Sequence, residues 1–343
     1  MDPSNSARLM VGSNQIQETK NAKDASPVWK VIGITGSTQF ITALAIAPSN
    51  GKTIYAGTAD KHLWVTTSAG TQWTKLDTGM FGVAPGYPVD IRVDPANSKH
   101  VFAVTGFGGT ASVWHLGPAD NFTKWANITG DLPSNLGVSA IFVDWQYAIP
   151  ALWVGTARGA YHSVNLGQNW TKFAVDLPNT NVTDLQGFSP RNILAAATSG
   201  RGAFEIFIKP SKITGSVIQN PGNKAVSGVL VFLETGGNAT PNQDEYKTTT
   251  DARGHYQFAK VGPGRYTPRV VPPPGLFQSR ASTRSLYVNG SDVTAPVLVV
   301  QSESAQLTAQ VEQVRAPELH LLPGQVSGVP ISTVGVPDPA REE

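Results

Sequence analysis

The chain of 343 residues contains no cysteine. Disulfide bonds, thiol nucleophiles and thiolate metal sites are therefore excluded. Only 15% of the residues are charged, whereas an ordinary soluble domain has roughly 25%. The net charge of +2 comes without any basic block. The sequence therefore lacks the electrostatic pattern of a nucleic-acid-binding protein.

Long apolar runs are also absent. No stretch approaches the roughly 18 apolar residues that a membrane helix requires, so we expect no membrane span. The first residues lack the basic region and the apolar core of a signal peptide. Glycine and proline are plentiful, at 34 and 25 residues. This composition favours a protein of short elements joined by many turns.

A tryptophan marks a repeated phrase in the first two thirds of the chain. Trp29, Trp73, Trp125 and Trp170 are separated by 44, 52 and 45 residues, and each opens a short strand-like segment. A period of this length with several short strands per unit is typical of a β-propeller. We therefore expect residues 1–208 to be propeller repeats, each with an inner, a second, a third and an outer strand, the last beginning at the tryptophan.

The first and the last repeat are shorter than the others. Residues 1–32 match only the second, third and outer strands, and the unit that starts at Val182 stops after its third strand. One interpretation is a small ring of about four or five blades that the N-terminal strands close. The other, which we prefer, is the C-terminal part of a longer protein whose upstream blades and export signal are missing.

One turn between repeats resembles a known motif. The sequence SVNLGQNW, from Ser163 to Trp170, is similar to the Asp-box (BNR) turn S/T-x-D-x-G-x-x-W of sialidases, sortilin-type receptors and xyloglucan-hydrolase propellers. Asn165 stands where that family has aspartate. The resemblance implies a propeller fold. It implies no activity, because Asp-box turns are structural.

Two aspartates are candidates for catalysis. Asp90 and Asp184 take the same inner-strand position in two repeats, where the other complete repeats have Ala43 and Ala140. Strand alternation places this position on one face, near the central channel. Glycoside hydrolysis requires two carboxyl groups that face each other. The alternative, which we favour, is that each aspartate caps the turn at which its strand begins.

The sequence changes character near residue 209, where alternating apolar strands and short turns begin. Residues 248–275, TTTDARGHYQFAKVGPGRYTPRVVPPPG, are similar to the B-type repeat of bacterial surface proteins (SdrD-type and CnaB-like) and to carboxypeptidase regulatory-like domains. The resemblance implies a transthyretin- or immunoglobulin-like β-sandwich over residues 209–301, with Asp251 and Gly254 in a hairpin turn. It also implies a carbohydrate-binding-like fold.

The SdrD-type resemblance implies calcium, bound in a loop of the form D-x-N-x-N-G-x-x-D-x-x-E. Calcium takes six to eight oxygen ligands, with a bidentate glutamate at the last position of such loops. The corresponding segment here is ETGGNATPNQDE, in which Gly236 and Ala239 depart from the pattern. The candidate calcium ligands are Glu234, Asn238, Thr240, Asn242, Asp244 and Glu245. The alternative is a solvated acidic hairpin, and no other cofactor is expected.

Residues 302–343 are polar and contain several prolines, which indicates a linker or a disordered tail. The sequence thus predicts an all-β protein: a partial or small β-propeller, a β-sandwich and a flexible tail. We expect a secreted or cell-surface bacterial protein with a non-catalytic binding or structural role, whose partner is a glycan or a protein at the cell surface. The alternative is a fragment of a propeller-type polysaccharide hydrolase that uses Asp90 and Asp184.

Overall fold

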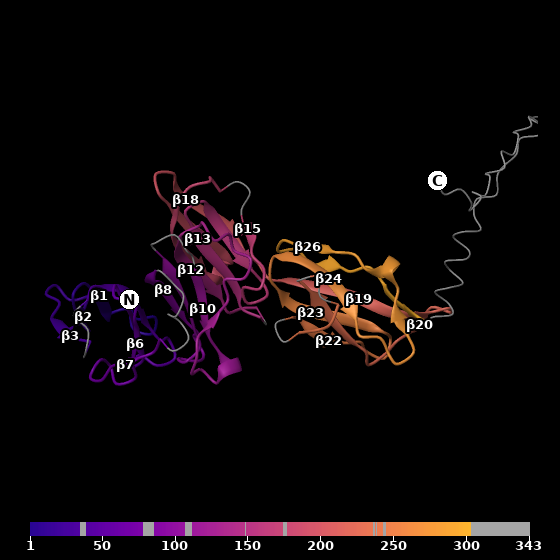
Figure 1. Ribbon diagram of the computed structural model, residues 1–343, viewed down its shortest axis with the longest axis horizontal. Coiled ribbons are helices and arrows are strands. Elements are labelled where there is room, and N and C mark those ends of the chain that lie inside the picture. The colour runs from indigo at the N-terminus through magenta and orange to yellow at the C-terminus, as the bar shows by residue number, and fades with distance from the viewer. Residues whose placement is uncertain are drawn as a thin grey trace, which may run out of the picture.

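The structure is a computed structural model of the whole chain (Figure 1). It describes residues 1–34, 39–77, 86–106, 112–147, 149–173, 177–235, 237, 239–242 and 245–302, without the side chains of Asp120 and Ser189. These residues form β-strands and three short 3-10 helices, namely η1 (Pro118–Asp120), η2 (Ser189–Arg191) and η3 (Arg280–Ser282). No helix in this part of the chain is long and apolar enough to cross a membrane. The all-β fold class is confirmed, while the expected tail lies outside the described residues apart from Ser302.

The N-terminal part of the described chain forms five antiparallel sheets, which we call blades 1 to 5 in chain order. Within each blade every strand pairs with the strand before it. The strands are β1 (Leu9–Gly12), β2 (Ile16–Thr19) and β3 (Trp29–Ile32) in blade 1; β4 (Ile41–Ile46), β5 (Ile54–Thr58), β6 (Leu63–Thr66) and β7 (Thr74–Lys75) in blade 2; β8 (Tyr87–Val93), β9 (Val101–Gly106), β10 (Ser112–Leu116) and β11 (Ala126–Asn127) in blade 3; β12 (Val138–Asp144), β13 (Ala151–Thr156), β14 (Gly159–Ser163) and β15 (Thr171–Phe173) in blade 4; and β16 (Val182–Phe188), β17 (Ile193–Thr198) and β18 (Gly202–Phe207) in blade 5. The first and last blades have three strands, as predicted, and the described strands of these two blades do not pair with each other.

The outer-strand tryptophans pack between neighbouring blades. Trp73 lies in the core that joins blades 1 and 2, Trp125 in the core of blades 2 and 3, and Trp170 in the core of blades 3 and 4. Their side chains are 9%, 2% and 8% exposed. Trp29, at the start of the outer strand of blade 1, differs from these three, because it is 43% exposed.

The inner strands of blades 2 to 5 share a β-bulge. In β4 the register with the second strand shifts between Ile41 and Ala43, and β8, β12 and β16 shift at the corresponding place. A bulge bends its strand and redirects the side chain that follows. The four residues after the shift therefore take equivalent places in their blades, and they are Ala43, Asp90, Ala140 and Asp184.

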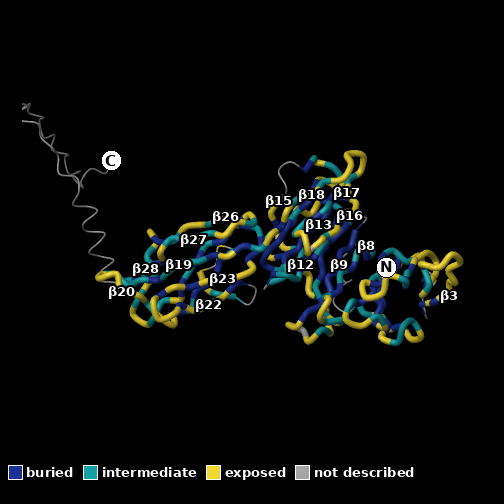
Figure 2. Tube along the Cα trace, turned by 180° about the vertical axis from the view of Figure 1, so that it is seen from behind, coloured by how far each residue is buried: buried dark blue, intermediate teal, exposed yellow. Residues whose placement is uncertain are grey.

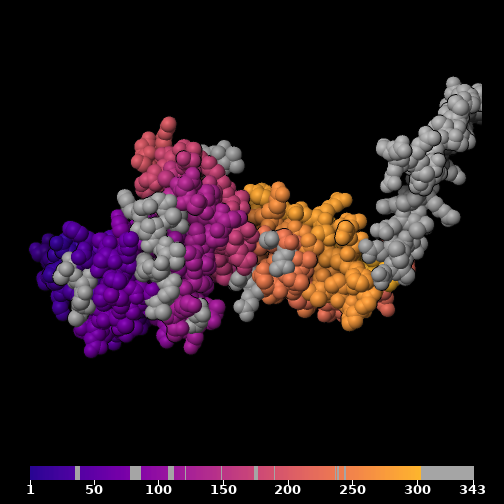
Figure 3. Space-filling view, in the orientation of Figure 1, coloured from indigo at the N-terminus to yellow at the C-terminus, as the bar shows by residue number. Residues whose placement is uncertain are grey.

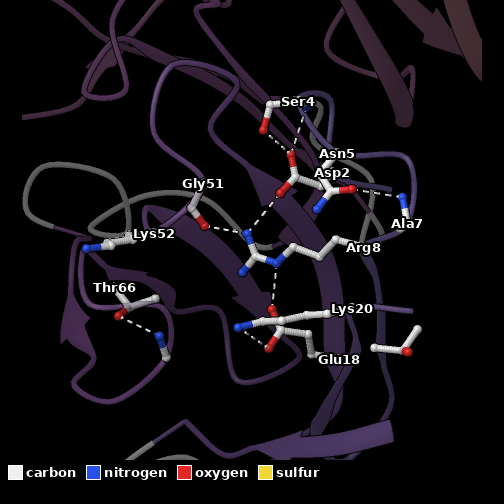
Figure 4. Close-up of polar contacts among 12 residues, drawn as sticks. Asp2, Ser4, Asn5, Ala7, Arg8, Glu18, Lys20, Gly51, Lys52 and Thr66 are labelled. Carbon is white, nitrogen blue, oxygen red and sulfur yellow. Dashed lines mark hydrogen bonds and ion pairs between the residues drawn. The ribbon is translucent and has the colours of Figure 1, made fainter. Parts of the chain in front are cut away.

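A buried ionic cluster connects blade 1 to blade 2 (Figure 4). Arg8 Nη1 lies 2.9 Å from Asp2 Oδ2, and Arg8 Nε lies 2.5 Å from Glu18 Oε1. The same guanidinium donates a hydrogen bond to the carbonyl oxygen of Gly51, in the turn between β4 and β5. Burial on its own would raise the pKa of the Asp2 carboxyl, but hydrogen bonds from Ser4 and the charge of Arg8 outweigh it and lower that pKa.

The second domain consists of two sheets that begin at Ser211. One sheet contains β19 (Ser211–Asn220), β20 (Lys224–Ala225), β23 (His255–Val261), β25 (Phe277–Gln278), β27 (Val293–Thr294) and β28 (Leu298–Gln301). The other contains β21 (Leu230–Glu234), β22 (Lys247–Thr249), β24 (Gly264–Val270) and β26 (Leu286–Val288). The predicted hairpin turn is present, since Asp251 Oδ1 accepts hydrogen bonds from the backbone N–H groups of Arg253 and His255, both at 2.8 Å. Gly254 has a φ of +75°, which glycine adopts without strain.

The molecule is elongated (Figures 1 and 3). Blades 1 and 2 lie at one end, the β-sandwich lies toward the other end, and blades 4 and 5 lie between them. Buried residues run without a break from blades 4 and 5 into the sandwich (Figure 2). One apolar core accordingly contains residues of both domains, among them Trp153, Val182, Val217 and Phe258.

Candidate functional site

The two candidate catalytic aspartates lie in one cavity. This cavity, of about 820 Å³, is lined by the inner strands of blades 2 to 5 and includes Asp90, Arg92 and Asp184. Arg92 Nη2 is 2.9 Å from Asp90 Oδ2 and 3.9 Å from Asp184 Oδ1. The inner-strand positions that the repeats predicted are therefore brought together, with an arginine between them that the sequence analysis did not identify as part of a site.

The hydrogen bonds of Asp90 join blade 3 to blade 4. Its Oδ1 accepts the backbone N–H of Ile91 at 2.8 Å, and its Oδ2 accepts the backbone N–H of Ile141 at 3.0 Å. Arg92 extends the same connection, because its Nε donates to the carbonyl oxygen of Ile141 and its Nη2 donates to that of Leu185 in blade 5. Asp90 and Arg92 thus connect three successive blades at the channel.

Asp184 repeats only part of this arrangement. Its Oδ1 accepts the backbone N–H of Leu185 at 2.8 Å, as Asp90 does with the next residue of its strand. The Asp184 side chain is 52% exposed, against 20% for Asp90. Asp90 and Asp184 each accept a hydrogen bond from the backbone N–H of the next residue, beside the bulge in their strand. This common contact indicates that both side chains help to shape the bulge.

The electrostatics distinguish Asp90 from an ordinary surface carboxylate. Burial raises the pKa of the Asp90 carboxyl, and the charge of Arg92 together with the hydrogen bonds from Arg92, Ile91 and Ile141 opposes that increase. A glycosidase acid needs a raised pKa and a free path to the leaving group. Here both carboxylate oxygens already accept hydrogen bonds from the protein, which supports a structural role for this residue.

The candidate calcium loop is described only in part, because Asn238 and Asp244 lie outside the described residues. Glu234, at the end of β21, forms a partly buried ion pair with Arg269 of the neighbouring strand β24. Thr240 is exposed, and the backbone N–H of Asn242 donates to Glu245 Oε2 at 3.0 Å. The ion pair with Arg269 already neutralises Glu234, so this residue is a weaker cation ligand than the sequence implied.

Glu245 fits a cation better. Its side chain is buried, with the residue 4% exposed, and Oε1 has no hydrogen-bond partner within the described residues. Burial, with a further contribution from the negative charge of Glu234, raises the pKa of the Glu245 carboxyl. A buried oxygen without a partner is costly, and a bound calcium would satisfy it. The described residues contain no group of three or more His, Cys, Asp or Glu side chains that could hold a metal, so such a site would depend on amide or backbone oxygens.

The joint between blade 4 and the sandwich is a polar contact that the sequence analysis missed. The turn Gly262–Gly264, between β23 and β24, lies against blade 4, where His162 Nε2 is 3.0 Å from the carbonyl oxygen of Pro263. Nδ1 of the same ring lies 3.3 Å from the carbonyl oxygen of Thr171, so both ring nitrogens face backbone acceptors. A second contact joins Asn165 Nδ2 to Thr235 Oγ1 at 3.0 Å.

Three tyrosines complete this joint. The Tyr147 hydroxyl donates to the carbonyl oxygen of Ile208 at 2.5 Å, and the Tyr266 hydroxyl donates to that of Gly262 at 2.9 Å. Burial, opposed in part by the hydrogen bonds of its hydroxyl group, raises the pKa of Tyr246 to about 12. Tyr266 belongs to the B-type segment of residues 248–275, whereas no motif or regular spacing in the sequence pointed to Tyr147 or Tyr246.

One known family is similar to the second domain. Residues 214–315 match the family model of the SdrD B-like domain, which supports the resemblance found in the sequence. This type of module is characteristic of bacterial surface proteins. No curated protein matches the chain. The similarity of the Ser163–Trp170 turn to an Asp-box stays a prediction.

Several solved structures resemble the chain weakly. A crystal structure of an ancestral GH74 enzyme has a TM-score of 0.46 at 14% identity, and the match covers 85% of this chain and 48% of that chain. The β-propeller domain of Cps50 (Swd1) from Myceliophteria thermophila has a TM-score of 0.44 at 12% identity, over 60% of this chain and 68% of that chain. The computationally designed Ika4 protein has a TM-score of 0.37 at 17% identity, over 51% of this chain and 95% of that chain. The propeller-like fold of the first domain rests on its own strand topology.

Proposed function

We propose that the chain is a non-catalytic structural module of a bacterial cell-surface or secreted protein, in which the sandwich holds the propeller at a fixed position. The observation that carries this proposal is the joint between the domains. His162, Asn165 and Tyr147 form hydrogen bonds across it or at its edge, above a continuous apolar core. A rigid connection of this kind suits a spacer that presents a domain to its surroundings.

The proposal assigns residues 1–208 to the propeller repeats, 209–301 to the sandwich and 302–343 to a linker or tail. The SdrD B-like match supports the extracellular location, because such modules occur in bacterial surface proteins. The partner would be a glycan or a protein at the cell surface, bound by the propeller. Calcium, held by Glu245 and neighbouring oxygens of the Glu234–Glu245 loop, would stabilise the sandwich.

The location can be tested on intact cells of the source organism. An antibody against the folded chain should label cells that have not been permeabilised, and external protease should remove the signal. Labelling that appears only after permeabilisation would overturn the proposal. An antibody against a cytoplasmic marker serves as the control for cell integrity.

A second candidate function is polysaccharide hydrolysis. The observation in its favour is that Asp90 and Asp184 line one cavity and share Arg92. If the propeller hydrolyses a glycan, Asp90→Ala or Asp184→Ala should abolish turnover in the protein that contains it. Retained turnover in both variants would exclude these carboxylates from the reaction.

A further inference from the structure

The last strand of blade 5, β18, is paired on one edge only in the described structure. In blades 2, 3 and 4 the third strand pairs with an outer strand, as β14 does with β15. In blade 5 the described chain leaves β18 after Phe207 and enters the sandwich at Ser211, so β18 pairs only with β17. An exposed edge of this kind can accept a further strand.

A cavity of about 670 Å³ lies where this outer strand would begin, between blades 4 and 5, and the sandwich residues Pro263, Gly264, Arg265 and Tyr287 line its remaining side. Comparison with the gap between blades 3 and 4 shows what the cavity would hold. There, Trp170 packs with Ile128 and Leu132, which follow Trp125 by three and seven residues. The residues that follow Trp170 by three and seven positions are Phe173 and Leu177, and both line the cavity.

The opposite wall of the cavity shows the same correspondence. Strand pairing makes Leu194, Ala196 and Phe204 of blade 5 equivalent to three residues of blade 4. Those three residues pack in the core that contains Trp170, and they are Leu152, Val154 and Tyr161. Leu194, Ala196 and Phe204 all line the cavity. Both walls are therefore those of a tryptophan site, and the outer-strand tryptophan is missing from the described structure.

Blade 1 has the complementary feature. Its outer strand β3 begins with Trp29, which is 43% exposed, whereas the other outer-strand tryptophans are at most 9% exposed. Val31, two residues further along the strand, is 49% exposed. Of the four residues of β3 only Ile32 is buried. The strand is therefore weakly held, and it carries the residue type that the cavity in blade 5 lacks.

The charges also match. If β3 pairs with β18 as β15 pairs with β14, the register places Lys30 opposite Glu205 and Val31 opposite Phe204. Lys30 and Glu205 are both exposed, and the described structure shows no ion pair for either. Opposite charges on facing residues of neighbouring strands stabilise the pairing. Blades 2, 3 and 4 have Thr74, Ala126 and Thr171 at the position of Lys30.

From this complementarity we infer that two copies of the chain associate by strand exchange. The β3 strand of one copy leaves its own blade, adds to the β18 edge of the other copy, and inserts Trp29 into the cavity between blades 4 and 5. Reciprocal exchange closes the pair as a symmetric dimer. The exchange breaks the pairing of β3 with β2 and exposes the site of Ile32, while it buries Trp29 and pairs the β18 edge.

Disulfide trapping tests the inference directly, because the chain has no cysteine of its own. A Lys30→Cys chain is mixed with a Glu205→Cys chain under mild oxidation. Facing residues of antiparallel strands lie within disulfide reach, so the mixture should give a covalent pair of chains. A mixture of Lys23→Cys and Glu205→Cys chains is the matched control, since Lys23 is an exposed lysine outside β3.

Two results of this experiment would overturn the inference. The first is no more cross-linked pair than in the Lys23→Cys control. The second is efficient cross-linking within single chains of the Lys30→Cys, Glu205→Cys double variant at high dilution, which would show that β3 reaches β18 of its own copy.

Molar-mass measurement of the full chain provides an independent result. The wild-type protein should dimerise with rising concentration, and Trp29→Ala should weaken dimerisation by about tenfold or more, as expected for a central aromatic anchor. Trp29 is half exposed in its own blade, so this variant should keep the fold. A wild-type protein that stays monomeric, or a Trp29→Ala variant that dimerises equally well, would contradict the exchange.

Discussion

His162 in blade 4 is hydrogen-bonded to the carbonyl oxygen of Pro263 in the sandwich, at 3.0 Å. The imidazole lies beneath the turn between β23 and β24, where Gly264 lies close to Val164 of blade 4. A Cβ atom at Gly264 would lie 3.3 Å from Val164 Cγ2, so Val164 would have to shift by a few tenths of an ångström to accept a larger residue there. The two domains thus meet where the backbone of the sandwich turn packs against side chains of blade 4.

Tyr147→Phe should weaken the joint. The change removes the only donor that the structure shows for the carbonyl oxygen of Ile208, and an unsatisfied buried acceptor costs about 1–3 kcal/mol. Denaturant unfolding should show a loss of stability of this size. Tyr161→Phe is the matched control, because no hydrogen bond of the Tyr161 hydroxyl is seen in the described structure. Equal losses in both variants would argue against a specific role of Tyr147.

Arg8→Met should destabilise blade 1. The substitution leaves the buried carboxylate of Asp2 without a cation and leaves Glu18 with only the exposed Lys20, 3.9 Å away. Removal of one partner of a buried ion pair typically costs about 3–5 kcal/mol. Denaturant unfolding followed by far-ultraviolet circular dichroism would report the loss. Lys23→Met removes an exposed positive charge and should be nearly neutral. A loss in Arg8→Met that is no larger than in Lys23→Met would show that the cluster does not stabilise the fold.

His115 should make the protein sensitive to acid. Burial, with the charge of His100 as a second cause, lowers the pKa of His115 from 6.5 to about 3 in the folded state. Between these values the unfolded chain binds a proton that the folded chain does not, so stability is complete above pH 6.5 and falls as the pH drops toward 3. The contribution amounts to at most about 1.4 kcal/mol per pH unit.

The measurement compares unfolding free energies of the wild type and His115→Gln from pH 7 to pH 4. The other titrating groups are common to both proteins, so the difference reports His115 together with its contact to His100. The wild type should lose more stability than the variant over this range. Parallel curves for the two proteins would contradict the assigned pKa.

Calcium should stabilise the sandwich through Glu245. The buried Oε1 atom of this residue has no partner among the described residues, and a cation there would remove the cost of its burial. An excess of calcium over EDTA should raise the Tm of the wild type and leave that of Glu245→Gln unchanged. Glu205→Gln, an exposed carboxylate on β18, should respond like the wild type. Identical calcium responses in Glu245→Gln and the wild type would place the ion elsewhere.

The repeat pattern predicted the propeller strands because its signal is local. Each tryptophan begins or directly precedes the outer strand of its blade, and Trp73, Trp125 and Trp170 are buried. The burial of a tryptophan also depends on the preceding blade, which is why Trp29 departs from the pattern. The local sequence therefore determines where each outer strand begins, whereas the neighbouring blade determines how far the tryptophan side chain is buried.

The site residues were harder to predict because their partners are distant in sequence. Equivalent bulges brought Asp90 and Asp184 to one cavity, as the repeats indicated. Arg269, however, pairs with Glu234 from another strand, 35 residues away, and no loop pattern shows this. The joint at His162 likewise depends on the packing of two domains, which the motifs of either domain do not encode.

The central claim is that the propeller and the sandwich form one rigid unit, and a distance measurement tests it most directly. Because the chain is free of cysteine, spin labels can be attached at Lys99→Cys in blade 3 and Arg253→Cys in the sandwich, both exposed positions. Double electron–electron resonance, with the labelled chain diluted in an excess of unlabelled chain so that distances between two copies are not measured, should then show one narrow distance distribution. A broad distribution would show that the domains move independently, and it would contradict the proposed role as a rigid surface module.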